Sequence, residues 1–185
     1  VDRISQWMRR FGLGSRTGID LPAEVAGNVP DPAWKRENRK EQWYVGDTYN
    51  LSIGQGDLLV TPLQVALYTA EIANGGRKVV PHLFSSASGT SAAALFATTT
   101  QIGAPSEVYA VVREGMRDGV VYGSGRSLST LPFSSAGKTG TAQWSSQANT
   151  HAWFTSFAPY EQPEVVVTVL LEEGGEGSSV PVPVA

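Results

Sequence analysis

The sequence predicts an α+β fold in which helices pack on an antiparallel sheet, a meander of about three strands. Amphipathic patterns at helical spacing recur along the first part of the chain, and three short strand patterns with short polar links follow from residue 134 on. With 185 residues, of which 41% are hydrophobic, the chain is long enough for one globular domain with its own core.

Two helices are predicted near the N-terminus. The first covers residues 1–11 and ends before the helix-stopping Gly12. Its apolar side chains recur at helical spacing: Val1, Ile4, Trp7, Met8 and Phe11. A short charged helix is predicted to begin at Pro32, with Asp31 as its cap, and to run through Lys40.

A third helix is predicted from Thr61, after an irregular glycine-rich stretch over residues 49–60. Thr61 can cap this helix, Pro62 suits its first position and Gln64 completes a capping box. The Asn-Gly-Gly run at 74–76 ends it. Its stripe of small apolar residues is expected to pack closely against a sheet: Leu63, Ala66, Leu67, Ala70 and Ala73.

The segment after the third helix contains few sequence patterns that predict secondary structure. Residues 78–84 are a short strand candidate, and residues 85–105 are predicted to be a flexible surface insertion because they are rich in Ser, Ala and Thr. Ser106 is predicted to cap a fourth helix that ends at Gly123-Ser124-Gly125. We expect its buried side to consist of Val108, Val111, Val112, Met116 and Val120.

Three strand candidates cover residues 134–144, 151–158 and 164–171. The last is apolar on both faces, which favours a central strand with cover on both sides of the sheet. The Gly-rich and Pro-spaced tail over residues 172–185 is not expected to form a covering helix. We therefore expect the chain to be part of a longer domain, cut at both ends.

Composition excludes several classes of function. The net charge is -3, from 14 basic and 17 acidic residues, so the chain lacks the excess of basic residues that is typical of nucleic-acid-binding proteins. Without Cys, and with only His82 and His151 far apart, neither a metal nor another cofactor is predicted. No apolar run is long enough to span a bilayer, and the charges within residues 1–11 do not fit a signal peptide.

The run Gly137-Lys138-Thr139 first suggests the end of a nucleotide-binding phosphate loop. That motif needs another glycine five positions earlier, where this chain has Pro132, which lacks a backbone N–H. A following strand, rather than a helix, would decide against nucleotide binding. A lysine-threonine-glycine triplet on a strand is instead one of three elements of the penicillin-recognising serine acyltransferases.

Further motifs in the order typical of that group extend this likeness over nearly the whole chain. They are Thr17-Gly-Ile-Asp-Leu21, Trp43-Tyr44, Gly46-Asp47-Thr48, Gly54-Gln55-Gly56, Thr61-Pro62-Leu63-Gln64, Asn74-Gly75-Gly76, Ala136 to Gln143, and His151-Ala-Trp-Phe154. With them the chain most resembles the class B penicillin-binding proteins of the elongation-specific type. Residues 1–185 would then be a partial transpeptidase domain.

The resemblance assigns roles to the strand that carries the triplet. A serine attacks the D-alanyl-D-alanine amide and the acyl group passes to an amine. Lys138 would support proton transfer, and the Thr139 and Thr141 hydroxyls would bind the terminal carboxylate. The Thr141 N–H would be an oxyanion donor and Gly140 would allow close approach. His151 and Trp153 are expected to pack rather than catalyse.

The same resemblance shows what the chain lacks. The family needs a Ser-x-x-Lys on a helix and a Ser-x-Asn; the formal match Ser135 to Lys138 lies on a strand, where positions three apart face opposite ways. The nucleophile is therefore expected upstream, and the isolated chain is expected to be inactive. Whether it folds alone, with a second fragment or by self-association stays open.

The resemblance also implies location and partners. The parent protein would be periplasmic or extracytoplasmic and anchored in the inner membrane through an upstream segment. Its partners would be peptidoglycan stem peptides, beta-lactams, the missing N-terminal part of its own domain and the cell-elongation machinery. A carboxypeptidase, beta-lactamase or beta-lactam sensor of the same superfamily, and a noncatalytic binding scaffold, stay open as alternatives.

Overall fold

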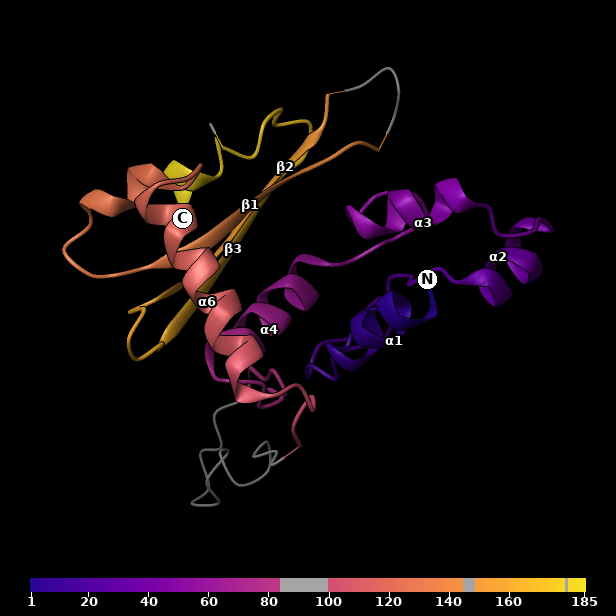
Figure 1. The fold of residues 1–185 in the computed structure, drawn as a ribbon, viewed down its shortest axis with the longest axis horizontal. Coiled ribbons are helices and arrows are strands. Elements are labelled where there is room, and N and C mark those ends of the chain that lie inside the picture. The colour runs from indigo at the N-terminus through magenta and orange to yellow at the C-terminus, as the bar shows by residue number, and fades with distance from the viewer. Residues whose placement is uncertain (84–99, 145–148, 179) are drawn as a thin grey trace.

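The computed structural model describes residues 1–83, 100–144, 149–178 and 180–185 (Figure 1). Most of the predicted insertion over 85–105 therefore lies outside the described residues. Its described end is held in place, because the Lys78 N–H donates to the Thr100 carbonyl (3.0 Å) and the Ile102 N–H to the Gly76 carbonyl (2.9 Å). The strand predicted over 78–84 is wrong for the described residues 78–83, which form no strand.

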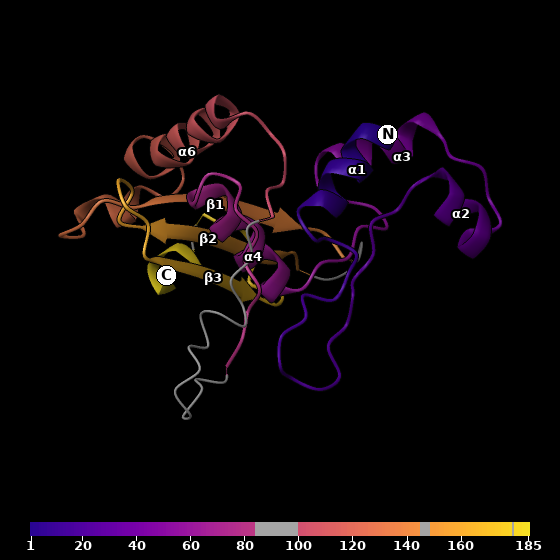
Figure 2. The same cartoon turned by 90° about the horizontal axis from the view of Figure 1, so that it is seen from below.

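Three helices lie apart from the sheet, as Figures 1 and 2 both show: α1 (Asp2–Arg10), α2 (Pro32–Arg39) and α3 (Val45–Ser52). The first two confirm the predictions, and the Asp31 carboxylate caps α2 by accepting from the Trp34 N–H (2.8 Å). The irregular stretch predicted over 49–60 is wrong up to Ser52. Asp47 stabilises α3 by accepting from the Tyr44 N–H and the Lys35 ammonium, both at 2.7 Å.

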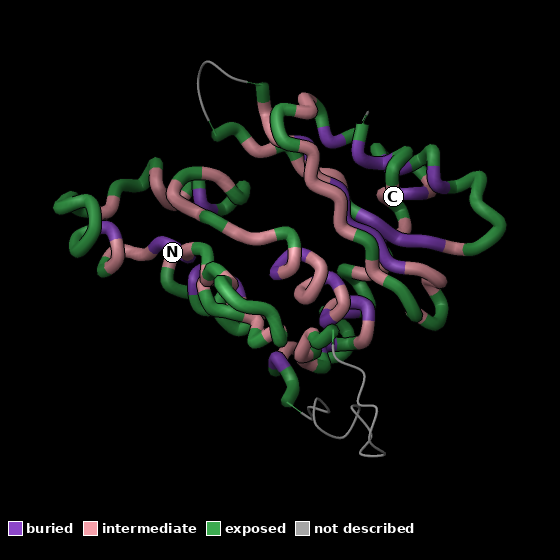
Figure 3. Tube along the Cα trace, turned by 180° about the vertical axis from the view of Figure 1, so that it is seen from behind, coloured by how far each residue is buried: buried purple, intermediate pink, exposed green. Residues whose placement is uncertain are grey.

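The sheet is an antiparallel meander in the order β1 (Ala136–Ala142), β2 (His151–Ala158) and β3 (Val165–Leu171), which confirms the predicted fold class. Buried residues concentrate along β2 (Figure 3). The prediction that the third strand is central is wrong: among the described residues β3 pairs with β2 alone. Val165, at its start, is 58% exposed.

Helix α4 (Pro62–Ala73) packs on β2 and β3, as predicted. Its capping box is present, with the Thr61 N–H donating to Gln64 Oε1 (2.9 Å) and the Gln64 N–H to Thr61 Oγ1 (3.1 Å). Of the apolar stripe predicted to pack on the sheet, only Ala73 is buried, and its other four members are half-buried. The residues that α4 buries are Gln64, Val65, Thr69, Glu71 and Ala73.

A chain of hydroxyl groups explains this choice of face. The Thr69 and Thr155 hydroxyl oxygens lie 2.9 Å apart, and those of Thr155 and Thr168 lie 2.8 Å apart. These groups satisfy one another across α4, β2 and β3, so a polar side chain can face the sheet without an unpaired hydroxyl.

Helix α6 (Ser106–Val121) runs beside β1, and Pro105 rather than Ser106 occupies its cap position. Of its predicted buried residues only Met116 and Val120 are buried, and Val111 is 67% exposed. Two short 3-10 helices, η1 (Arg126–Thr130) and η2 (Val182–Val184), also pack on the sheet.

Two apolar clusters cover the sheet. One joins Ala73, Met116, Ala136 and Phe157; the other joins Val120, Leu128, Phe154 and Val182. Phe154 and Phe157 differ in parity along β2 and so point to opposite faces. The C-terminal tail thus supplies cover through Val182, although it forms only a short 3-10 helix.

Candidate active site

Strand β1 carries the whole Gly-Lys-Thr-Gly-Thr run, so a strand and not a helix follows the triplet. The nucleotide-binding hypothesis is therefore wrong. The register shows which residues of β1 share a face: Lys138 pairs with Thr155, on the face that α4 covers, whereas Thr139 pairs with Phe154, on the face of η1 and η2. The ammonium and the hydroxyls thus leave the strand on opposite faces.

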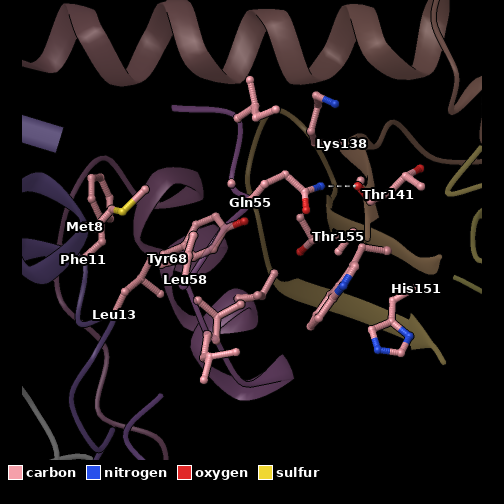
Figure 4. Close-up of a pocket in the computed structure, with 18 of the residues that line it drawn as sticks. Met8, Phe11, Leu13, Gln55, Leu58, Tyr68, Lys138, Thr141, His151 and Thr155 are labelled. Atoms are coloured by element: carbon pink, nitrogen blue, oxygen red, sulfur yellow. Dashed lines mark hydrogen bonds between the residues drawn. The ribbon is translucent and has the colours of Figure 1, made fainter. Parts of the chain in front are cut away.

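Strands β1 and β2 both line a cavity of about 1140 Å³ (Figure 4). Lys138, Thr139, Gly140 and Thr141 all contribute to its lining. Across the cavity lie apolar side chains of α1, of its C-cap Phe11 and of α4, among them Ile4, Trp7, Met8, Val65 and Tyr68. A mostly apolar cavity with a few convergent polar groups is the usual form of a binding site.

Both threonine hydroxyls of the motif are held by neighbours from other segments. The Thr139 and Ser124 hydroxyl oxygens lie 2.7 Å apart, and the Gly177 N–H donates to Thr141 Oγ1 (3.1 Å). Because Thr141 Oγ1 accepts that hydrogen bond, its own O–H is left to donate. Gly177 must be glycine for this approach, since a Cβ atom there would lie 2.1 Å from the Gly140 carbonyl oxygen.

A glutamine from the loop between α3 and α4 reaches β1. Gln55 stands between Gly54 and Gly56, both with positive φ (74° and 78°), in a conformation that glycine adopts without strain. Its Nε2 donates to the Thr141 carbonyl (3.1 Å), and its Oε1 accepts from the Gln143 N–H (3.3 Å), as Figure 4 shows for the first bond.

Strand β1 begins one residue after Ser135, so of the formal match Ser135 to Lys138 only the last three residues lie on the strand. Lys138 Nζ donates to the Thr139 carbonyl (2.6 Å), whereas Ser135 is 3% exposed and its hydroxyl has no partner among the described residues. The His151 ring stacks on Trp144, with ring centroids 5.5 Å apart. The described residues hold no group of three or more metal-ligating side chains. Among the helices of the described ranges, none has the length and hydropathy of a bilayer-spanning segment.

Sequence reasoning found the β1 motif but gave no role to three residues that contact it: Gln55, Ser124 and Gly177. Their sequence signal is weak. A polar residue flanked by glycines, as in Gly-Gln-Gly and Gly-Ser-Gly, marks a side chain on a tight turn, but it does not say which strand that side chain meets.

Comparisons with known proteins identify the family of the chain. The chain matches the model of the penicillin binding protein transpeptidase domain over residues 1–185. It is 38% identical to the peptidoglycan D,D-transpeptidase MrdA of Acinetobacter baumannii, covering 97% of this chain and 29% of that protein. The chain therefore spans less than a third of the length of this curated relative.

Solved structures of similar fold are also penicillin-binding proteins. Penicillin-binding protein 2 of Pseudomonas aeruginosa, in complex with WCK 5153, is 35% identical with a TM-score of 0.88, covering 100% of this chain and 40% of that one. Penicillin-binding protein 2 of Helicobacter pylori, in complex with MreC, is 34% identical with a TM-score of 0.86, over 99% of this chain and 34% of that one. The chain belongs to the penicillin-binding protein transpeptidase domain family.

Proposed function

We propose that the protein carrying this chain is a peptidoglycan D,D-transpeptidase of the elongation-specific type, penicillin-binding protein 2. The observation that carries the proposal is the edge of β1, where Lys138, Thr139 and Thr141 line one cavity. An ammonium, two hydroxyls and a backbone amide are the groups that a peptide with a terminal carboxylate and a reacting carbonyl requires.

In this mechanism the serine hydroxyl attacks the carbonyl carbon of the D-alanyl-D-alanine bond, and the amide C–N bond breaks as the terminal D-alanine leaves with a proton. The acyl ester is then attacked by an amine of a second stem peptide, which restores the serine. Lys138 supports the proton transfer, and Thr139 and Thr141 bind the carboxylate. The Thr141 N–H stabilises the oxyanion, a role worth about 3 kcal/mol per donor.

The rest of the parent protein supplies what these residues cannot. The chain spans 29% of its Acinetobacter relative, and we place the nucleophilic serine in the remainder, against the cavity that β1 lines. The Helicobacter neighbour is a complex with MreC, which supports a partner in the cell-elongation machinery. The site would face the periplasm, with an upstream membrane anchor.

Labelling with a fluorescent penicillin tests the proposal. The full-length protein is expected to form a covalent adduct, and Lys138→Ala is expected to slow its formation by roughly 100-fold or more. Arg36→Ala, which removes an exposed cation from α2, is the matched control and should label normally. A full-length protein that takes no label would contradict the proposal and favour a noncatalytic scaffold.

The isolated chain is expected to take no label because its serine nucleophile is missing. Labelling that Ser135→Ala abolishes would show that the nucleophile lies within the chain after all. Analysis of the products of the full-length protein separates the related activities. Cross-linked dimers indicate transpeptidation, whereas shortened monomers indicate a carboxypeptidase, and hydrolysed penicillin indicates a beta-lactamase.

A further inference from the structure

The outward side of β1 can be assigned from one hydrogen bond. Along an antiparallel strand, the N–H and C=O of alternate residues point toward the paired strand and away from it. The Thr141 carbonyl accepts from Gln55 and not from β2, so the backbone groups of Gly137, Thr139 and Thr141 point outward together with the Gln143 N–H.

Helix α6 closes one end of this edge. A Cβ atom on Gly119 would lie 2.8 Å from the Gly137 carbonyl oxygen, so the helix backbone rests directly on the strand edge there. No additional strand can pair with Gly137 while α6 occupies this position. A peptide that approaches β1 therefore meets an open edge only beyond this residue.

Gln55 closes the other end. Its carboxamide donates to the Thr141 carbonyl (3.1 Å) and accepts from the Gln143 N–H (3.3 Å). A neighbouring strand would pair with the same two outward groups through its own peptide units, so the side chain takes the place of one residue of such a strand. Between the two covers lie the outward N–H groups of Thr139 and Thr141.

We propose that Gln55 is a positioning residue that caps the edge of β1, fixes the backbone of Thr141 and limits the edge open to a peptide to the backbone of Thr139 and the Thr141 N–H. This inference rests on the proposed function, because it concerns how the same strand receives the end of a stem peptide. A short window suits a substrate that ends in a carboxylate, whereas a long extended chain would have to displace Gln55.

The cap also matters for the direction of the oxyanion donor. Anchoring the Thr141 carbonyl and the Gln143 N–H holds the end of the strand, and the Thr141 N–H points across the same edge. Catalytic donors need positions accurate to about 0.5 Å. Losing the cap would therefore slow the chemical step more than it weakens initial binding.

The test uses the full-length protein with three variants. Gln55→Leu removes both hydrogen bonds, Gln55→Glu keeps only the acceptor for the Gln143 N–H, and Gln6→Leu is a control on the exposed side of α1. For Gln55→Leu we expect the penicillin acylation rate constant to fall about 10- to 100-fold. The noncovalent dissociation constant should change by no more than about threefold, a split that general loss of structure would not produce.

Hydrogen exchange at the Gln143 amide supplies a second measurement. Exchange should accelerate in Gln55→Leu and stay slow in Gln55→Glu, while the unfolding midpoints of both variants are recorded to show that they fold. Unchanged acylation in Gln55→Leu, or unchanged Gln143 exchange, would overturn the inference. If the unmodified protein is not acylated at all, the proposed function fails, and the exchange comparison alone still decides whether Gln55 caps β1.

Discussion

Two glycines of α6 lie about one helical turn apart. Replacing each by alanine separates the effect of helix propensity on stability from the effect of packing against β1. A Cβ atom at Gly115 would meet open space, whereas one at Gly119 would lie 2.8 Å from the Gly137 carbonyl oxygen. Exchanging Gly for Ala inside a helix stabilises it by about 1 kcal/mol, and both positions share this gain. The overlap at Gly119 forces α6 or β1 to shift, and overpacking of this kind costs about 1–3 kcal/mol.

We therefore expect Gly115→Ala to raise the free energy of unfolding by up to about 1 kcal/mol. Gly119→Ala should lie about 1–3 kcal/mol below it. Urea unfolding of both variants in the full-length protein measures the difference, with equal m-values as a check on two-state behaviour. Only Gly119→Ala should also slow penicillin acylation, because its strain enters β1 beside Lys138. Equal stabilisation of both variants would refute the packing of α6 on the strand edge.

Three further predictions concern buried polar groups and the site. Burial raises the pKa of Glu71 from 4.5 to about 7, so the folded state binds the proton more tightly than the unfolded state. The free energy of unfolding should therefore fall by about 3 kcal/mol as the pH rises from below the unfolded-state pKa to above the folded-state pKa. Glu71→Gln should remove that dependence in urea unfolding at several pH values; a surviving slope would point to another group. Gln64, buried, donates to two backbone carbonyls at 2.8 Å each, so Gln64→Leu should cost about 3 kcal/mol, against almost nothing for the exposed Gln101→Leu. Ser124→Ala frees the Thr139 hydroxyl and should weaken noncovalent beta-lactam binding about fivefold, or 1 kcal/mol, with the unfolding midpoint unchanged; unaltered binding would show that Ser124 does not orient Thr139.

Local signals predicted the elements well where the chain itself supplies the hydrogen-bond partners. The strand over 151–158 has the predicted bounds, and the capping box at Thr61 forms as expected. The buried faces of the helices were harder to predict. Periodicity shows where apolar residues gather on a helix, but it does not show which element packs against them. In α6, Tyr109 is buried with its ring against Gly76, whereas Val111 is exposed.

The candidate site likewise has a part that the sequence predicts and a part that it does not. The Lys138–Thr141 run is visible in the sequence, but its supports come from distant positions. Gln55 lies 86 positions from Thr141, and Gly177 lies 36 positions from it. Pairings at such separation depend on the completed fold, and no local pattern in the chain encodes them.

The contact between Gly177 and β1 bears on how the protein is shortened for structural work. A version trimmed after Leu171 would retain all three strands and the complete motif, and it would look intact by sequence. It would also lose the amide that donates to Thr141 Oγ1 and the backbone that rests on Gly140. Inhibitor affinities measured on such a trimmed protein would therefore describe a threonine freed from its orienting neighbour.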